Sequence, residues 1–92
     1  MVTDNPELGR FELVEEGKPA FADYRLEGNA LVLSHVAVDP ALRGHGTAGR
    51  LMAGVMEIIR ERELKVVPLC GYAVTYIARH PEYHDLLDHQ SS

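Results

Sequence analysis

The sequence predicts a small α/β fold with a mixed sheet, in the element order β-β-β-α-β-α. Three observations lead to this prediction. Two runs before residue 27 alternate between apolar and polar side chains, which is typical of half-buried strands. The most apolar run, residues 30–38, follows them directly. A segment with helical periodicity at residues 47–63 then separates that run from another apolar run at residues 65–70.

Length and composition limit the function classes. The chain has 92 residues, so we expect one domain spanning residues 1–92. A net charge of −5 argues against general nucleic-acid binding, which requires a basic surface. Cys70 is the one cysteine, which excludes an intramolecular disulfide and fits a reducing, cytoplasmic location. We expect neither a signal peptide nor a bilayer-spanning segment, and so no membrane partner, because no apolar run is long enough.

The first two strands are predicted to form a hairpin. Residues 10–15 and 19–26 both alternate, and Glu16-Gly17-Lys18 between them is a turn signal. The run at residues 30–38 is apolar on both faces. We therefore expect it to lie in the middle of the sheet and to be covered on both sides.

His35 is a polar residue in this apolar run. Strand alternation predicts that its ring shares a face with Leu31, Leu33 and Ala37. A ring buried on that face needs a hydrogen-bonding partner. One interpretation is a core histidine held by a backbone carbonyl, and the other is an acid–base or substrate-orienting group near the end of a central strand.

The helical segment carries one apolar stripe. Its members are Leu51, Met52, Val55, Met56 and Ile59. We interpret the two methionines as core filling. Gly54 lies in the middle of this helix at a cost of roughly 1 kcal/mol relative to Ala, and close packing on the sheet would explain its presence.

The segment after the helix reads as an edge strand and a short helix. Pro68 cannot donate a hydrogen bond, so the strand at 65–70 is expected to have an unpaired edge or a bulge there. Residues 72–80 fit a short helix that ends at Pro81. His80 and His84 are four residues apart, but Pro81 disrupts the shared face that a metal site needs, so we predict no metal. We expect His45, His84 and His89 at the surface.

A glycine-rich loop connects the central strand to the long helix. It contains Gly44 and Gly46 around His45, and it leads directly into the helix. Glycine lets backbone N–H groups approach a ligand, and the first N–H groups of a helix attract anions. The loop lacks both the G-x-G-x-x-G fingerprint and the Lys-Ser/Thr of a P-loop. The alternatives are a simple turn or a phosphate site, and convergence at the carboxyl ends of the strands favours the phosphate site.

These residues carry a resemblance to a known family. The hexapeptide Arg43-Gly44-His45-Gly46-Thr47-Ala48 is similar to the Arg/Gln-x-x-Gly-x-Gly/Ala signature of the GNAT acyltransferase superfamily. Over roughly residues 8–88 the chain resembles the small yjdJ-type N-acetyltransferase-like proteins, through His35 to Ala48, Pro68-Leu69-Cys70, Tyr76-Ile77 and His80-Pro81-Glu82-Tyr83.

The resemblance implies a truncated GNAT fold with splayed central strands and a site for acetyl-coenzyme A or coenzyme A. The loop would hold the pyrophosphate through the backbone N–H groups of Arg43, Gly44, His45, Gly46, Thr47 and Ala48. The strand end at Val36, Ala37 and Val38 would pair with the pantetheine amides, and Tyr76 would contact the cofactor arm.

The resemblance also implies direct acetyl transfer to an unidentified amine. His35 would be the base or orienting group, and Cys70 would protonate the leaving thiolate, act as a transient nucleophile or simply fill the core. Where the family often has Thr-Glu after the histidine, this chain has Val36 and Ala37. A non-catalytic coenzyme A-binding module and an interaction protein without a nucleotide stay open as alternatives. We expect a monomer or a weak homodimer.

Overall fold

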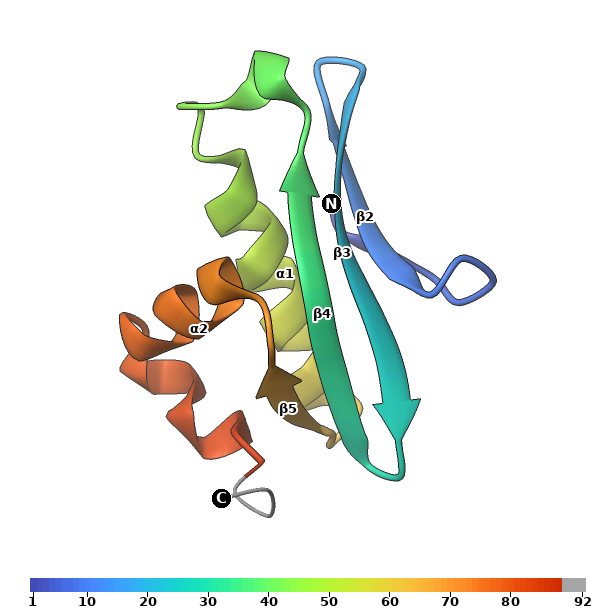
Figure 1. Ribbon diagram of the computed structural model, residues 1–92, viewed down its shortest axis with the longest axis vertical. Helices are drawn as coiled ribbons and strands as arrows, with labels where there is room; N and C mark the ends of the chain where they lie inside the picture. Colours follow the sequence, from blue (N-terminus) through green and yellow to red (C-terminus); the bar gives the residue numbers. More distant parts are fainter. Residues whose placement is uncertain (89–92) are drawn as a thin grey trace.

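The sheet has five strands in the order β1-β2-β3-β4-β5, and the computed structural model describes residues 1–88 (Figure 1). The strands are β1 Thr3–Asn5, β2 Arg10–Glu15, β3 Lys18–Glu27, β4 Ala30–Val38 and β5 Lys65–Pro68. The helices are α1 Thr47–Glu61 and α2 Gly71–Ala78, with the 3-10 helices η1 Pro40–Leu42 and η2 Pro81–Leu86.

The predicted mixed topology is confirmed. Strands β1 to β4 are antiparallel neighbours, whereas β5 pairs in parallel with β4 after the α1 crossover. The structure adds β1 and the 3-10 helices to the predicted order. Helix α1 ends two residues before the expected position, and β5 ends at Pro68 because the chain turns there into α2.

One face of the sheet carries the core. Side chains from β2, β3, β4 and β5 form a single apolar cluster with α1, α2 and η2. Met52 and Met56 are fully buried in this cluster, which confirms that they fill the core. None of the helices within residues 1–88 has the length and apolar character that crossing a bilayer requires.

A bulge in β4 overturns the predicted position of His35. Asp23 pairs with His35 and Tyr24 pairs with Leu33, so Ser34 has no partner and the side-chain alternation shifts by one residue. The core face therefore continues from Leu33 to Val36, and His35 is exposed on the opposite face. The expectation that His35 shares a buried face with Leu31 and Leu33 was wrong.

The expectation that β4 is covered on both sides was also wrong for its second half. Ser34 and His35 are exposed, because the helices pack on the other face of the sheet. The face that carries His35 also carries Phe21 from β3, whose ring lies 6.5 Å from the His35 ring and 4.6 Å from Cζ of Arg10.

Strands β4 and β5 stay paired over only part of their length. The ladder ends where Leu33 pairs with Pro68, followed by one hydrogen bond of 2.9 Å from the Leu69 N–H to the Leu33 carbonyl. β4 continues to Val38 without a strand partner on that side. Cys70 follows at the N-cap of α2, beside this separation.

Gly54 packs against the N-terminal segment. A Cβ atom on Gly54 would collide with the side chain of Val2, whose own Cβ would lie 2.7 Å away. The close contact predicted for this glycine is present, but its partner is Val2 beside β1.

Candidate functional site

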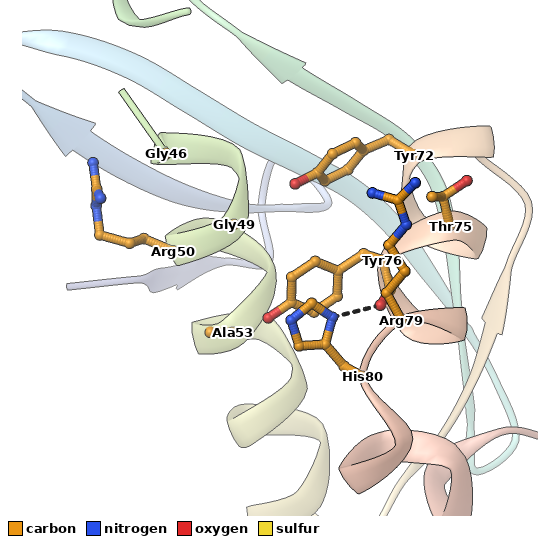
Figure 2. A pocket seen from close by; sticks show the side chains of 9 residues that line it. All are labelled: Gly46, Gly49, Arg50, Ala53, Tyr72, Thr75, Tyr76, Arg79 and His80. Carbon is orange, nitrogen blue, oxygen red and sulfur yellow. Dashed lines mark hydrogen bonds between the residues drawn. The ribbon is translucent and has the colours of Figure 1, made fainter. Parts of the chain in front are cut away.

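A groove of about 450 Å³ separates α1 from α2 (Figure 2). Its lining residues are Gly46, Gly49, Arg50, Ala53, Tyr72, Thr75, Tyr76, Arg79 and His80. In Figure 2, Tyr72 and Tyr76 extend from α2 toward α1, whereas Arg50 is directed away from both tyrosines. The volume lies in the range of sites that bind small molecules and cofactors.

A second hollow of about 260 Å³ adjoins this groove at the glycine-rich loop. It is lined by Val38, Leu42, Arg43, Gly44, Gly46, Thr47, Ala48, Gly49 and Tyr72. Both hollows share Gly46, Gly49 and Tyr72. The fold thus brings the end of β4, the predicted loop and Tyr76 into one continuous depression.

The loop presents backbone N–H groups without partners. The first helical hydrogen bond of α1 runs from the Arg50 N–H to the Gly46 carbonyl at 3.1 Å. Within residues 1–88, no hydrogen bond engages the N–H groups of Gly44, Gly46, Thr47, Ala48 and Gly49. The N–H groups of Arg43 and His45 differ, because turn hydrogen bonds to Pro40 and Leu42 occupy them. Such a row of unpaired donors at a helix start suits an anion.

The backbone conformation favours glycine at two positions of the loop, and a third glycine leaves open space beside it. Gly44 and Gly46 have φ angles of 82° and 79°, which other residues rarely adopt. At Gly49 a Cβ atom would meet no protein atom within 4 Å, so the protein itself does not exclude a side chain there. Its absence leaves open the space at Gly49 that both hollows share.

The positive charges near the depression differ in their pairing. Five arginines form ion pairs with carboxylates: Arg10, Arg25, Arg50, Arg60 and Arg62. Among residues 1–88, the arginines without such a pair are Arg43 and Arg79, and each lines one of the two hollows. In a chain of net charge −5, the uncompensated guanidinium groups therefore lie at this depression.

The carboxylate of Glu15 neutralises the positive charge of Arg50. This carboxylate accepts hydrogen bonds from Arg50 Nε at 2.6 Å and Nη2 at 2.8 Å, and from the Thr47 hydroxyl at 2.6 Å. These bonds lower the pKa of Glu15 to about 2, the one from Arg50 contributing most and the one from Thr47 next. Sequence analysis missed this residue, because Glu15 is 35 positions from Arg50 and no local pattern connects them.

Aromatic rings form the α2 wall of the groove. The Tyr76 and His80 rings stack with centroids 3.9 Å apart and an interplanar angle of 16°. His80 Nδ1 lies 2.7 Å from the Tyr76 carbonyl oxygen, which can only accept, so Nδ1 carries a hydrogen and donates it. Burial is the largest cause that raises the pKa of Tyr76, to about 12, which keeps its hydroxyl protonated.

Cys70 is half-buried and its thiol has a lowered pKa. Burial favours the neutral thiol, but the nearby backbone groups of Ala73, Tyr72 and Val36 favour the thiolate and outweigh burial, so the thiol pKa is lowered. The Cys70 side chain makes no capping hydrogen bond at the start of α2 in this structure. The effect is therefore the stabilisation that these backbone groups would give to a thiolate at the separation between β4 and β5.

His35 lies apart from the other predicted site residues. Its ring lines neither hollow, and no contact within residues 1–88 joins it to Cys70. Ala37 is partly buried opposite Phe21 on β3. His45 and His84 are exposed as expected, and His89 lies outside the described residues.

Sequence reasoning also missed Arg79. Arg79 is the C-cap of α2 and lines the groove because α2 packs beside α1, an arrangement for which the sequence contains no signal. The spacing of Tyr72, Tyr76 and Arg79, four and then three residues apart, is that of one side of a helix, and it could have indicated a shared face.

Comparisons with known proteins support the fold and identify the family. The solution structure of a protein from Staphylococcus aureus, described as GCN5-like, superimposes with a TM-score of 0.73 and 25% sequence identity, covering 98% of this chain and 92% of that one. No curated protein sequence matches. The family model of the GCN5-related N-acetyltransferases matches residues 10–86. The chain therefore belongs to the GCN5-related N-acetyltransferase family.

Proposed function

We propose that this protein binds acetyl-coenzyme A in the depression between α1 and α2 and transfers the acetyl group to an amine. The observation that carries the proposal is the set of unpaired N–H groups at Gly44 and at residues 46–49, beside the uncompensated Arg43. Members of the family generally use acetyl-coenzyme A. We further propose that the protein acts in the cytoplasm.

The residues fit the diphosphate of this cofactor. Two phosphate groups need several N–H donors, and the helix start offers those of Thr47, Ala48 and Gly49 in succession. They also need close approach to the backbone, which the open space at Gly49 permits. The proposed set of N–H donors differs from the one that the sequence implied. Arg43 would contribute its side chain in place of its N–H group, His45 would contribute no N–H group, and the N–H group of Gly49 is added.

The rest of the depression suits the two ends of the cofactor. Toward α2, the stacked Tyr76 and His80 offer a flat wall for a base, and Arg79 offers a positive charge for the ribose phosphate. Toward the sheet, the half of β4 that has no partner on the β5 side offers backbone groups at Val36 to Val38 for the amides of the thiol arm.

The cofactor supplies an activated acetyl thioester when bound. Cys70 lies beside the separation of β4 and β5, where the backbone favours its thiolate. A lowered thiol pKa supports both proposed roles of Cys70, as nucleophile and as acid, because each is most effective with a pKa near the working pH. His35, on the exposed face of the same strand, would take a proton from the acceptor amine.

Calorimetric titration of the intact protein with acetyl-coenzyme A tests binding. We expect one site per chain, and Arg43→Gln should weaken binding whereas Arg25→Gln, a surface arginine outside both hollows, should not.

Turnover with a panel of amines then tests catalysis. We expect His35→Ala and Cys70→Ala to lower turnover, and His35→Ala to leave the affinity unchanged because its ring lines neither hollow. Absence of binding would refute the proposal.

A non-catalytic coenzyme A-binding module is the second candidate. The observation that favours it is the position of His35 on the opposite face of β4 from the core, without contact to Cys70 within residues 1–88. Binding without turnover on any amine of the panel would favour the module over the transferase.

A further inference from the structure

We propose that Glu15 is a positioning residue that orients the backbone donors of the anion site through Arg50 and Thr47. The inference rests on the proposed function, because it concerns the same loop. Glu15 ends β2, at the hairpin beside the α1 start, and its carboxylate accepts three hydrogen bonds from that helix. It touches neither hollow itself.

Arg50 connects Glu15 to the glycine-rich loop through hydrogen bonds. Its Nη2 donates to a Glu15 oxygen and also to the carbonyl oxygen of His45, both at 2.8 Å. The His45 carbonyl and the Gly46 N–H belong to one trans peptide unit, so they point in opposite directions. Holding the carbonyl against Arg50 therefore directs the Gly46 N–H away from Arg50, where no group within residues 1–88 occupies it.

Thr47 provides the second connection between Glu15 and the start of α1. It is the first residue of α1, the residue is 1% exposed, and its hydroxyl donates to Glu15 at 2.6 Å. This bond fixes the first helical residue to β2 and thus sets the direction of the N–H groups of Thr47 and the residues that follow. Gly46 provides no side-chain cap that could do this instead.

The sign of the effect distinguishes positioning from simple electrostatics. A carboxylate near an anion site repels the anion, so removing its charge should strengthen binding by Coulomb interaction alone. Positioning predicts the opposite result. In Glu15→Gln, one amide NH₂ must face an N–H of Arg50 whichever way the side chain turns, because Nε and Nη2 meet the two different oxygens.

The test measures the affinity for coenzyme A of the full chain by calorimetry. We expect Glu15→Gln to bind about tenfold more weakly, the scale of one charge-assisted hydrogen bond. Arg50→Gln should have a similar effect, and the double variant should be no weaker than the more severe single variant. Asp85→Asn is the matched control, because it breaks another arginine–carboxylate pair of α1, with Arg60 at 3.0 Å, away from both hollows.

A backbone readout separates positioning from general loss of structure. In ¹H–¹⁵N spectra of the ligand-free protein, the Gly46 amide resonance should move in Glu15→Gln and in the double variant, but not in Asp85→Asn. If Glu15→Gln does not fold, Arg50→Lys replaces it, since lysine offers a single nitrogen in place of the Nε and Nη2 pair that meets the two Glu15 oxygens.

The outcomes are distinct. Failure of the wild type to bind refutes the proposed function. Binding by the wild type with equal or tighter binding by Glu15→Gln, or by Arg50→Lys where it replaces that variant, overturns the role of Glu15. Additive losses in the double variant, or an unmoved Gly46 resonance, overturn it as well.

Discussion

Gly49 separates stability from ligand binding, because one added methyl group should change the two in opposite directions. The residue lies in the first turn of α1, and a Cβ atom there meets no atom within 4 Å. Gly49→Ala therefore gains helix propensity without a clash, about 0.5–1 kcal/mol. The melting temperature of a domain of this size rises by about 4–8 °C for each kcal/mol.

The same methyl group should weaken binding of coenzyme A. It would stand on the floor shared by both hollows and hold an anion away from the Gly49 N–H. Loss of one charge-assisted hydrogen bond corresponds to about tenfold or more in affinity. Thermal unfolding followed by circular dichroism gives the stability, and calorimetry gives the affinity.

Gly71→Ala is the matched control for this prediction. Gly71 opens α2, its Cβ would also meet no atom, and it lines neither hollow. We expect a gain in stability and an unchanged affinity. If Gly49→Ala bound coenzyme A as tightly as the wild type, the ligand would not approach this turn. If its melting temperature fell, the space above Gly49 would not be open.

Three further predictions concern other parts of the chain. Gly54→Ala should destabilise the fold by about 1 kcal/mol, since the collision with Val2 outweighs the gain in helix propensity, and adding Val2→Ala should restore the stability in urea unfolding. Arg79→Gln should weaken coenzyme A by about threefold to tenfold and leave dephospho-coenzyme A unchanged in calorimetry, because only the former carries the ribose phosphate; equal losses for both ligands would refute this assignment. The alkylation rate of Cys70 by iodoacetamide should rise with pH through a midpoint below that of the urea-unfolded protein, because the folded backbone stabilises the thiolate. A midpoint at or above the unfolded value would contradict that environment.

Local patterns were sufficient to predict most of the fold. The hairpin follows from alternation on both sides of Glu16-Gly17, and the crossover follows from a helical stripe between two apolar runs. The loop at Gly44 and Gly46 was also predictable, because positive φ angles and a following helix favour glycine there. Each of these signals lies within a few consecutive residues.

The errors arise where distant segments meet. Ser34 carries no mark of a bulge, yet the register against β3 reverses every side chain after it, including His35. The partner of Gly54 is Val2, and the partner of Arg50 is Glu15, both far away in the chain. Such pairings depend on how the elements pack, which periodicity within one element does not report.

The bulge has a consequence for the proposed chemistry. Without it, His35 would face the core, and its ring would compete for space with the helices. With it, the ring faces the uncovered side of the sheet, while the backbone of the next residue, Val36, favours the thiolate of Cys70. Because β5 ends at Pro68, no strand within residues 1–88 pairs with this edge of β4 beyond Leu33. His35 and Cys70 therefore lie on opposite faces of a stretch of β4 that is unpaired on one side, and under the proposed function an acceptor amine would have to bind at this edge for both residues to act on it.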